Sequence, residues 1–370
     1  MRQNGCRKPS ARVADRPGWA QTYLRPEAAW PLSRGAGVTV AVIGSGVDAS
    51  AGAASGALAG RLTLGPRLHG DGDAGRDCVG HGTVLANLIA GRRTADGGPS
   101  GLAPGAKVLA VAVTDDAGST NADLLARGIR AAADGGARVA VVAAPIAEAT
   151  PALAEAVGYA TAKGMLLVAP VGPDGQSVAV PVYPAAYPGV LAVTALAADG
   201  SVAGASASGG PAPVGPANGR ASRVDLAAPG EALLAAGPGG GTFTASGPSY
   251  AAALVAGAAA LVLGRSPGLT VEQLTERLRA TAYRPGTALP DPTVGWGTVD
   301  PTTAVTTGNP TTAAGAPPSV EPVVVPPPAD RSAERLASAV TGVSLGGAAL
   351  VGLAAAAVRA GRRRGARHPE

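Results

Sequence analysis

The chain has 370 residues, a formal net charge of +5 and 46% hydrophobic residues, which is enough apolar material for one large domain with appendages. It contains only one Phe and three Trp, so Ala, Val and Gly must fill most of the core. The positive charge gathers near the N-terminus and in an arginine cluster at 359–367, and the middle of the chain is nearly neutral. This distribution argues against a nucleic-acid-binding groove, which needs basic residues on the folded domain.

The two cysteines, Cys6 and Cys78, could form a disulfide, remain free thiols or supply half of a metal site. No CxxC pair and no suitably spaced histidine supports a metal site, so we expect neither a metal nor another cofactor. A bridge between the N-terminal segment and the body requires an oxidising compartment.

Residues 1–34 are polar, contain proline and lack clear periodicity, with Trp19 and Trp30 expected to anchor them to the body. The segment lacks the apolar core of a signal peptide. An exported protein would therefore need a signal upstream of the start shown, or one that has been removed.

The middle of the chain alternates short β-branched or apolar runs with helical patterns, which predicts a parallel sheet covered on both faces. The predicted strands lie at 38–43, 107–113, 138–144, 165–169 and 190–195, and the predicted helices at 81–92, 120–134 and 151–163. Sites in such sheets form beyond the carboxyl ends of the strands, where Gly44 and the segment after Ala169 fall.

The stretch around Ser249 predicts a buried helix over about 249–263, because no charge interrupts it before Arg265. A serine at its start lies among backbone N–H groups that have no partner inside the helix. Those N–H groups could stabilise an oxyanion by donating hydrogen bonds to it. The alternative is a serine that merely caps a core helix.

Downstream, Thr270-Val271-Glu272-Gln273 predicts a capping box that opens another helix, to about Ala282. The segment 305–337 is rich in Thr, Ala and Pro, a composition that is typical of an extended linker. Residues 338–358 carry no charge over a length that could cross a bilayer, and the basic tail 359–370 fits the positive-inside rule. We therefore expect a single transmembrane helix, with a soluble Ala-rich helix as the alternative.

Taken together, these segments resemble the subtilisin-like serine proteases of peptidase family S8, and among them the mycosins, membrane-anchored subtilases of actinobacterial type VII secretion systems. The resemblance covers about 12–370. Its motifs are Trp19-Ala20-Gln21, the segment 29–38, Asp77-Cys78-Val79-Gly80-His81-Gly82-Thr83, the segment 183–190 and Asp225-Leu226-Ala227-Ala228-Pro229-Gly230. It implies a subtilisin-like α/β fold over 35–304 behind an N-terminal extension at 1–34. It also implies a Cys6–Cys78 disulfide that joins this extension covalently to the domain.

In that family an aspartate orients a histidine, which takes the proton of the attacking serine. The resemblance places His81 and Ser249 at the last two positions, but Gly44 stands where the aspartate belongs. Asp48 lies four residues further on, past the strand end, and its spacing does not place it against His81.

Three further departures from the family's motifs also indicate a loss of catalytic activity. The asparagine of the family's oxyanion hole is absent near Val171, where the chain reads Ala169-Pro170-Val171. Pro248 precedes the serine and restricts the turn that aims it. Pro145 stands in the strand that would pair with a bound peptide, and it cannot donate a ladder hydrogen bond.

Loss of the aspartate alone costs about 3 × 10⁴ in kcat in a subtilase. Loss of an oxyanion donor costs about 10²–10³. The sequence therefore predicts a pseudoprotease that docks on a type VII secretion membrane complex, with its globular domain outside the cytoplasm and its tail inside. The alternatives are a weak or specialised serine endopeptidase that uses His81 and Ser249, and a module that binds an exported peptide or protein without cutting it.

Overall fold

The computed structural model describes residues 5–53, 56–93, 97–175, 181–203, 223–286 and 288–308 of the globular part, together with Gly347 and 350–359 near the C-terminus. The chain divides into two compact units, Met1–Asn309 and Pro310–Glu370. The first unit contains all of the sheet strands and the candidate site.

A seven-stranded parallel sheet runs through the first unit, in the order β2-β3-β1-β4-β5-β6-β7. Its strands are β1 (Thr39–Gly44), β2 (Leu62–Arg67), β3 (Lys107–Ala112), β4 (Val139–Val142), β5 (Leu166–Pro170), β6 (Val190–Leu196) and β7 (Leu226–Pro229). Five of these were predicted from their apolar runs, and β2 and β7 were missed. β2 carries a glycine and a proline, and at four residues β7 is short and starts beside a charged residue.

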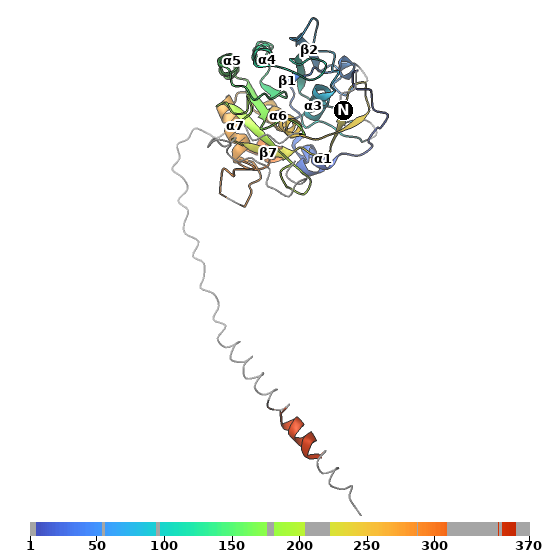
Figure 1. Ribbon diagram of the computed structural model, residues 1–370, viewed down its shortest axis with the longest axis vertical. Helices are drawn as coiled ribbons and strands as arrows, with labels where there is room; N and C mark the ends of the chain where they lie inside the picture. Colours follow the sequence, from blue (N-terminus) through green and yellow to red (C-terminus); the bar gives the residue numbers. More distant parts are fainter. Residues whose placement is uncertain are drawn as a thin grey trace, which may run out of the picture. The chain divides into compact units, whose positions relative to one another are not determined.

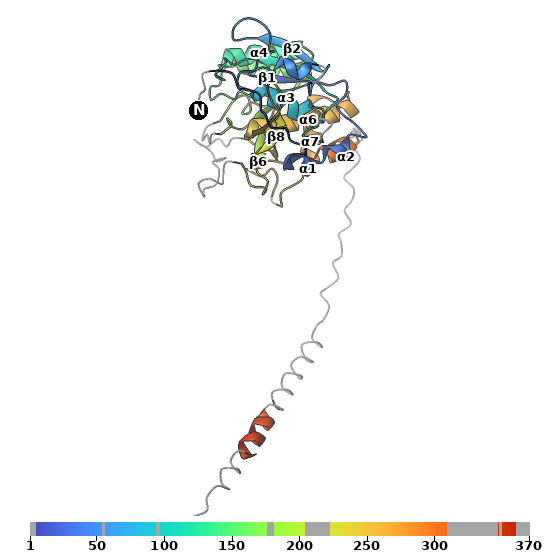
Figure 2. The ribbon, with the colours of Figure 1, turned by 90° about the vertical axis from the view of Figure 1, so that its right-hand side faces the viewer.

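Helices cover the sheet on both faces, as predicted (Figures 1 and 2). Alternate residues of β1 divide between two cores: Val40 and Val42 join α3 (His81–Ala90) and α6 (Pro248–Arg265), whereas Ala41 and Ile43 join α4 (Ala122–Asp134) and α5 (Pro151–Ala162). This division follows from the two-residue repeat of a strand. It explains why the strands are apolar throughout rather than alternating.

Helix α6 is the buried element predicted around Ser249, and it starts one residue earlier than expected, at Pro248. A proline suits the first position of a helix because the N–H that it lacks would have had no partner there. The residues from Ser249 to Leu263 are all buried. α6 is long and apolar enough to cross a membrane, but 83% of it is enclosed within the fold, so it is a core helix.

The remaining elements flank this core. The helix α7 (Val271–Ala280) begins with the predicted capping box between Thr270 and Gln273. The chain also forms α1 (Trp19–Leu24), α2 (Pro26–Ala29), the single-turn helix η1 (Ala49–Gly52), α8 (Pro301–Thr306) and an antiparallel hairpin of β8 (Leu233–Ala236) and β9 (Thr242–Ala245). α1 and α2 are too short to produce a periodic pattern, which is why residues 1–34 appeared irregular in the sequence.

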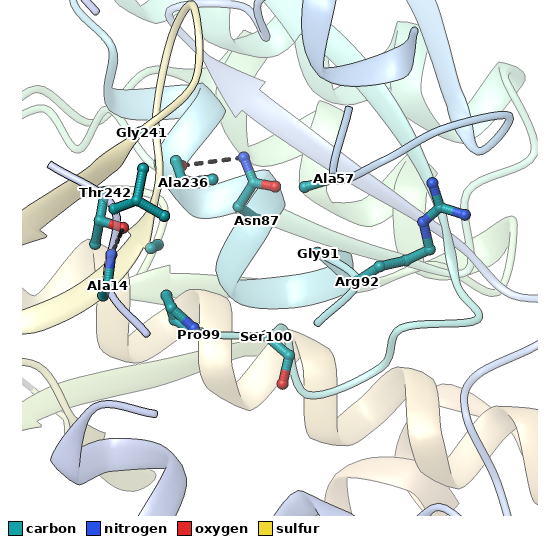
Figure 3. Close-up of a pocket in the computed structure, with 12 residues that line it drawn as sticks. Ala14, Ala57, Asn87, Gly91, Arg92, Pro99, Ser100, Ala236, Gly241 and Thr242 are labelled. Atoms are coloured by element: carbon teal, nitrogen blue, oxygen red, sulfur yellow. Dashed lines mark hydrogen bonds between the residues drawn. The ribbon is translucent and has the colours of Figure 1, made fainter. Parts of the chain in front are cut away.

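The N-terminal extension is fastened to the body at several points. Cys6 and Cys78 form the disulfide that the resemblance implied, and Trp19 and Trp30 donate from their indole N–H groups to the carbonyls of Glu231 and Leu102, both at 2.8 Å. Figure 3 shows a further contact, in which Ala14 N–H donates to the Thr242 hydroxyl. The extension is thus part of the folded unit.

The close-up in Figure 3 also shows a small cavity of about 80 Å³ under this extension. The Asn87 amide lies on its wall and donates to the Ala236 carbonyl at 3.1 Å. The Asn87 carbonyl oxygen is buried and has no hydrogen-bond partner among the described residues. A bound water would satisfy it.

In the second unit, a helix runs over Leu350–Arg359, and its described residues are exposed. Large apolar side chains are among them: Leu350, Val351, Leu353 and Val358 are 60–72% exposed. Gly347 is also helical, and the other residues of the predicted transmembrane segment 338–358 lie outside the described part of the chain, as does most of the tail. Of the predicted linker 305–337, Val305 and Thr306 belong to α8 and Val305 is buried, and the residues from 309 on lie outside the described part.

The burial of α6 leads to a first expectation. Leu261 is fully buried in α6, so Leu261→Ala should lower the free energy of unfolding by about 2–5 kcal/mol. Leu32 is 45% exposed, and Leu32→Ala should change the stability by no more than about 0.5 kcal/mol. Denaturant titration of both variants measures the difference. Equal effects would contradict the central position of α6.

Candidate active site

A cleft opens at the carboxyl edge of the sheet, where ligands bind in folds of this kind. It encloses about 270 Å³. Its walls come from the ends of β1, β4 and β5 and from the starts of α3 and α6. The lining residues are Gly44, Ser45, Val79, His81, Thr114, Gly118, Thr120, Ala143, Ala144, Pro145, Ile146, Pro173, Asp174 and Ser249. The structure therefore brings together Gly44, His81 and Ser249, which the sequence singled out.

His81 is the first residue of α3, and its position is fixed by the turn before it. Gly80 adopts a left-handed conformation with φ of 79°. The buried carboxylate of Asp77 accepts hydrogen bonds from the N–H groups of Gly80 and Thr83, both at 2.8 Å. The Tyr250 ring then packs edge-on against the imidazole, with the ring centroids 5.0 Å apart. Burial, followed by the charge of Asp174, raises the pKa of the Tyr250 hydroxyl well above its usual value.

Ser249 lies in the first turn of α6 and is 1% exposed. Its Oγ atom is buried and has no hydrogen-bond partner among the described residues. It therefore makes no hydrogen bond to the His81 imidazole, the contact through which a general base would activate it.

The partner of His81 is Asp174, a residue that the sequence analysis did not single out. Asp174 follows β5 in a short turn, and its Oδ2 atom lies 2.8 Å from His81 Nε2. Its Oδ1 atom accepts the backbone N–H of Ser249 at 2.9 Å. One carboxylate thus bridges the histidine and the amide of the serine. A signal for it existed, since an acidic residue just beyond a strand at this edge is a site candidate.

Gly44 is the last residue of β1, and no carboxylate reaches the cleft from there. Asp48 does not replace it, as the spacing predicted. The Asp48 carboxylate accepts the N–H groups of Ser50 at 2.9 Å and Gly239 at 2.6 Å. It caps η1 and binds the turn of the β8–β9 hairpin, and no hydrogen bond joins it to His81 in the described structure.

The resemblance places the lost oxyanion asparagine near Val171, directly after β5. Val171 N–H donates to the Val193 carbonyl, and the Val171 side chain packs against the core beneath α4 and α5 rather than lining the cleft. The group that faces the serine amide is Asp174, three residues further along the chain. Among the described residues that line the cleft, none is an asparagine or a glutamine.

The two prolines occupy distinct places. Pro248 is the first residue of α6, a position that accommodates it without loss of a hydrogen bond. Pro145 lines the cleft, and Ile146 directly after it pairs with Tyr183 through two backbone hydrogen bonds of 3.0 and 2.7 Å.

Within the described residues, no group of three or more His, Cys, Asp or Glu side chains could hold a metal ion.

Comparison with known proteins assigns the chain to a family. Residues 35–297 match the model of the subtilase family, peptidase S8. The chain belongs to this family. It is 33% identical to Mycosin-1 of Mycolicibacterium smegmatis, over 96% of this chain and 87% of that protein. It is a mycosin-type subtilase.

Solved structures agree with this assignment. The crystal structure of MycP1 from Mycobacterium smegmatis matches with a TM-score of 0.68 and 30% identity, over 87% of this chain and 94% of that one. MycP3 protease from a type VII (ESX-3) secretion system matches with a TM-score of 0.67 and 28% identity, over 83% and 93%. The predicted subtilisin-like α/β fold of this mycosin-type chain is confirmed.

Backbone geometry does not require a glycine at 44. A Cβ there would meet only Ala143 Cβ, at 3.6 Å, and φ lies outside the left-handed region. Gly44→Ala should therefore stabilise the fold by about 0.4–1 kcal/mol, because it restricts the unfolded chain.

The matched control is Gly46, where φ is 98° and a Cβ would lie 2.7–2.8 Å from the carbonyls of Arg76 and Ala74. Gly46→Ala should cost at least about 1–3 kcal/mol. Chemical denaturation of both variants tests this contrast. A comparable loss in Gly44→Ala would mean that the backbone, rather than the site, requires the glycine.

Proposed function

We propose that this mycosin-like subtilase is a non-catalytic, membrane-anchored component of a type VII secretion system. A mycosin relative is similar over nearly the whole chain, and MycP3 protease, a relative of known structure, comes from a type VII (ESX-3) secretion system. The observation that carries the non-catalytic part is the arrangement at the serine. His81 is hydrogen-bonded to Asp174, and the Ser249 hydroxyl has no partner in the described structure.

The chemistry supports this proposal step by step. A serine attacks a peptide carbonyl only when a base removes its proton. Here the base would be His81, whose Nε2 atom is occupied, while Gly44 offers no carboxylate to orient the ring. With losses of about 10⁴–10⁵ from an ordinary turnover of about 10 s⁻¹, one cleavage would take from a quarter of an hour to hours. Such a rate does not suit a processing enzyme.

Peptide capture without cleavage is less well supported than a scaffold role. A bound peptide would extend along the segment after β4, but Pro145 has no N–H to donate. The backbone groups of the next residue, Ile146, pair with Tyr183 of the same chain. We therefore assign the contact with the secretion complex to the outer surface of the domain.

Membrane anchoring is part of the same proposal. The exposed apolar side chains of Leu350–Arg359 support an anchor over 338–358, and the arginines that follow support a cytoplasmic tail at 359–370. The domain 35–304 would then lie outside the cytoplasm, joined to the anchor by the linker 305–337. The Cys6–Cys78 disulfide fits that oxidising side.

One observation favours the second candidate function, a weak or specialised serine endopeptidase. His81 and Ser249 line the same cleft from the starts of adjoining helices, as a catalytic pair would. That function requires His81 to leave Asp174 and turn to the serine. Genetic replacement of the serine separates the two functions.

In the native host, Ser249→Ala should leave secretion and assembly of the membrane complex at the wild-type level, because the hydroxyl does no chemistry. Ser246→Ala, three residues upstream, is the matched control. Removal of residues 309–370 should abolish membrane association and secretion. Quantification of secreted substrate and of the co-purified membrane complex provides the measurement.

The proposal is contradicted if Ser249→Ala stops secretion as completely as the truncation does while the protein level is unchanged. That result would favour the endopeptidase.

A further inference from the structure

We propose that the start of α6 and His81 form a carboxylate-binding site, and that Asp174 is its tethered occupant. Asp174 would thereby close the cleft to carbonyl and carboxylate groups from outside. This inference rests on the proposed loss of catalysis and adds a second cause, independent of Gly44.

Two donors meet at one carboxylate. Ser249 N–H donates to Asp174 Oδ1 at 2.9 Å, and His81 Nε2 lies 2.8 Å from Oδ2. The N–H groups at the start of a helix attract negative charge because they have no partner within the helix. A carboxylate between such a group and an imidazole is a favourable arrangement, which explains why Asp174 turns into the cleft.

The same two donors are those that an acyl-transfer site would use. A serine amide at a helix start stabilises the oxyanion that forms on the attacked carbonyl. The imidazole must be available to the serine hydroxyl. Asp174 engages both, so a substrate carbonyl finds the amide occupied and the base held away from the serine.

The surroundings are shaped to this occupant. Gly247, just before α6, has φ of 145°, and a Cβ at that position would collide with the Asp174 carboxylate. The side chains of His81 and Asp174 are 16% and 22% exposed, so their contact is largely shielded from water. The buried Ser249 hydroxyl remains beside them without a partner among the described residues.

Acetate is a direct probe of the site, because it offers the same carboxylate without the tether. In ¹⁵N-labelled full-length protein in detergent micelles, the Ser249 amide resonance should not respond to acetate in the wild type. In Asp174→Ala the same resonance should shift saturably over the same range of acetate concentrations. Asp116→Ala is the control, since Asp116 pairs with Arg67 and Arg76 outside the active-site cleft. An equal response in wild type and Asp174→Ala overturns the inference.

A second measurement tests whether substitutions at Asp174 and Gly44 make the Ser249 hydroxyl reactive. Asp174→Asn replaces an acceptor oxygen with an amide that can donate at the oxyanion position. Gly44→Asp supplies the missing carboxylate. The double variant should react with a fluorophosphonate about 10²-fold faster than Gly44→Asp alone.

Equal rates in Gly44→Asp and the double variant, with a silent wild type, would overturn the role of Asp174 and leave the non-catalytic proposal intact. Labelling of the wild type at Ser249 would contradict the non-catalytic proposal itself. The two failures are therefore distinguishable.

Discussion

Burial of α6 is the constraint on which the rest of this structure depends. A helix with no polar face is stable only when side chains surround it. Here strands β4, β5, β6 and β7 cover one side, with a smaller contact from β1, and α3 and α8 pack against others. Since the chain has few aromatic residues, close packing of Ala, Val and Gly supplies this contact, with Gly257 lying against Leu102. The position of the Ser249 amide follows directly from this packing, because the helix cannot shift without opening the core.

The same constraint keeps the shape of the site independent of its chemistry. The backbone of α3 and α6 is held by apolar packing and by caps such as Asp77, which do not depend on the reactive side chains. A scaffold held in this way does not depend on which residue stands at position 44. Two of the donors at the site are satisfied within the chain, since Asp174 accepts from the His81 imidazole and from the Ser249 backbone N–H, whereas the Ser249 hydroxyl has no partner among the described residues. Buried polar groups require partners, and here an internal partner takes the place of a substrate.

Much of the fold could be predicted because it follows from periodicity. The apolar runs at β1, β3, β4, β5 and β6 and the buried helix at Ser249 are local patterns, and they fixed the sheet and its carboxyl edge. The strands β2 and β7 and the β8–β9 hairpin could not be predicted, because tertiary contacts rather than local patterns stabilise them. Asp174 was missed for a related reason: its role depends on how a turn of a few residues folds back over α6. The resemblance directed attention to Val171, whereas the turn after β5 brings Asp174 to the Ser249 amide.

We propose above that Ser249 is chemically inert in an intact subtilase fold. Fluorophosphonate labelling of the full-length wild-type protein tests this inertness, with Ser249→Ala as the blank and an active subtilase such as thermitase as the positive control. We expect the wild-type signal to equal that of Ser249→Ala while circular dichroism shows a folded domain. Labelling of the wild type that disappears in Ser249→Ala would contradict the account, because it would mean that the serine is activated despite Gly44 and Asp174.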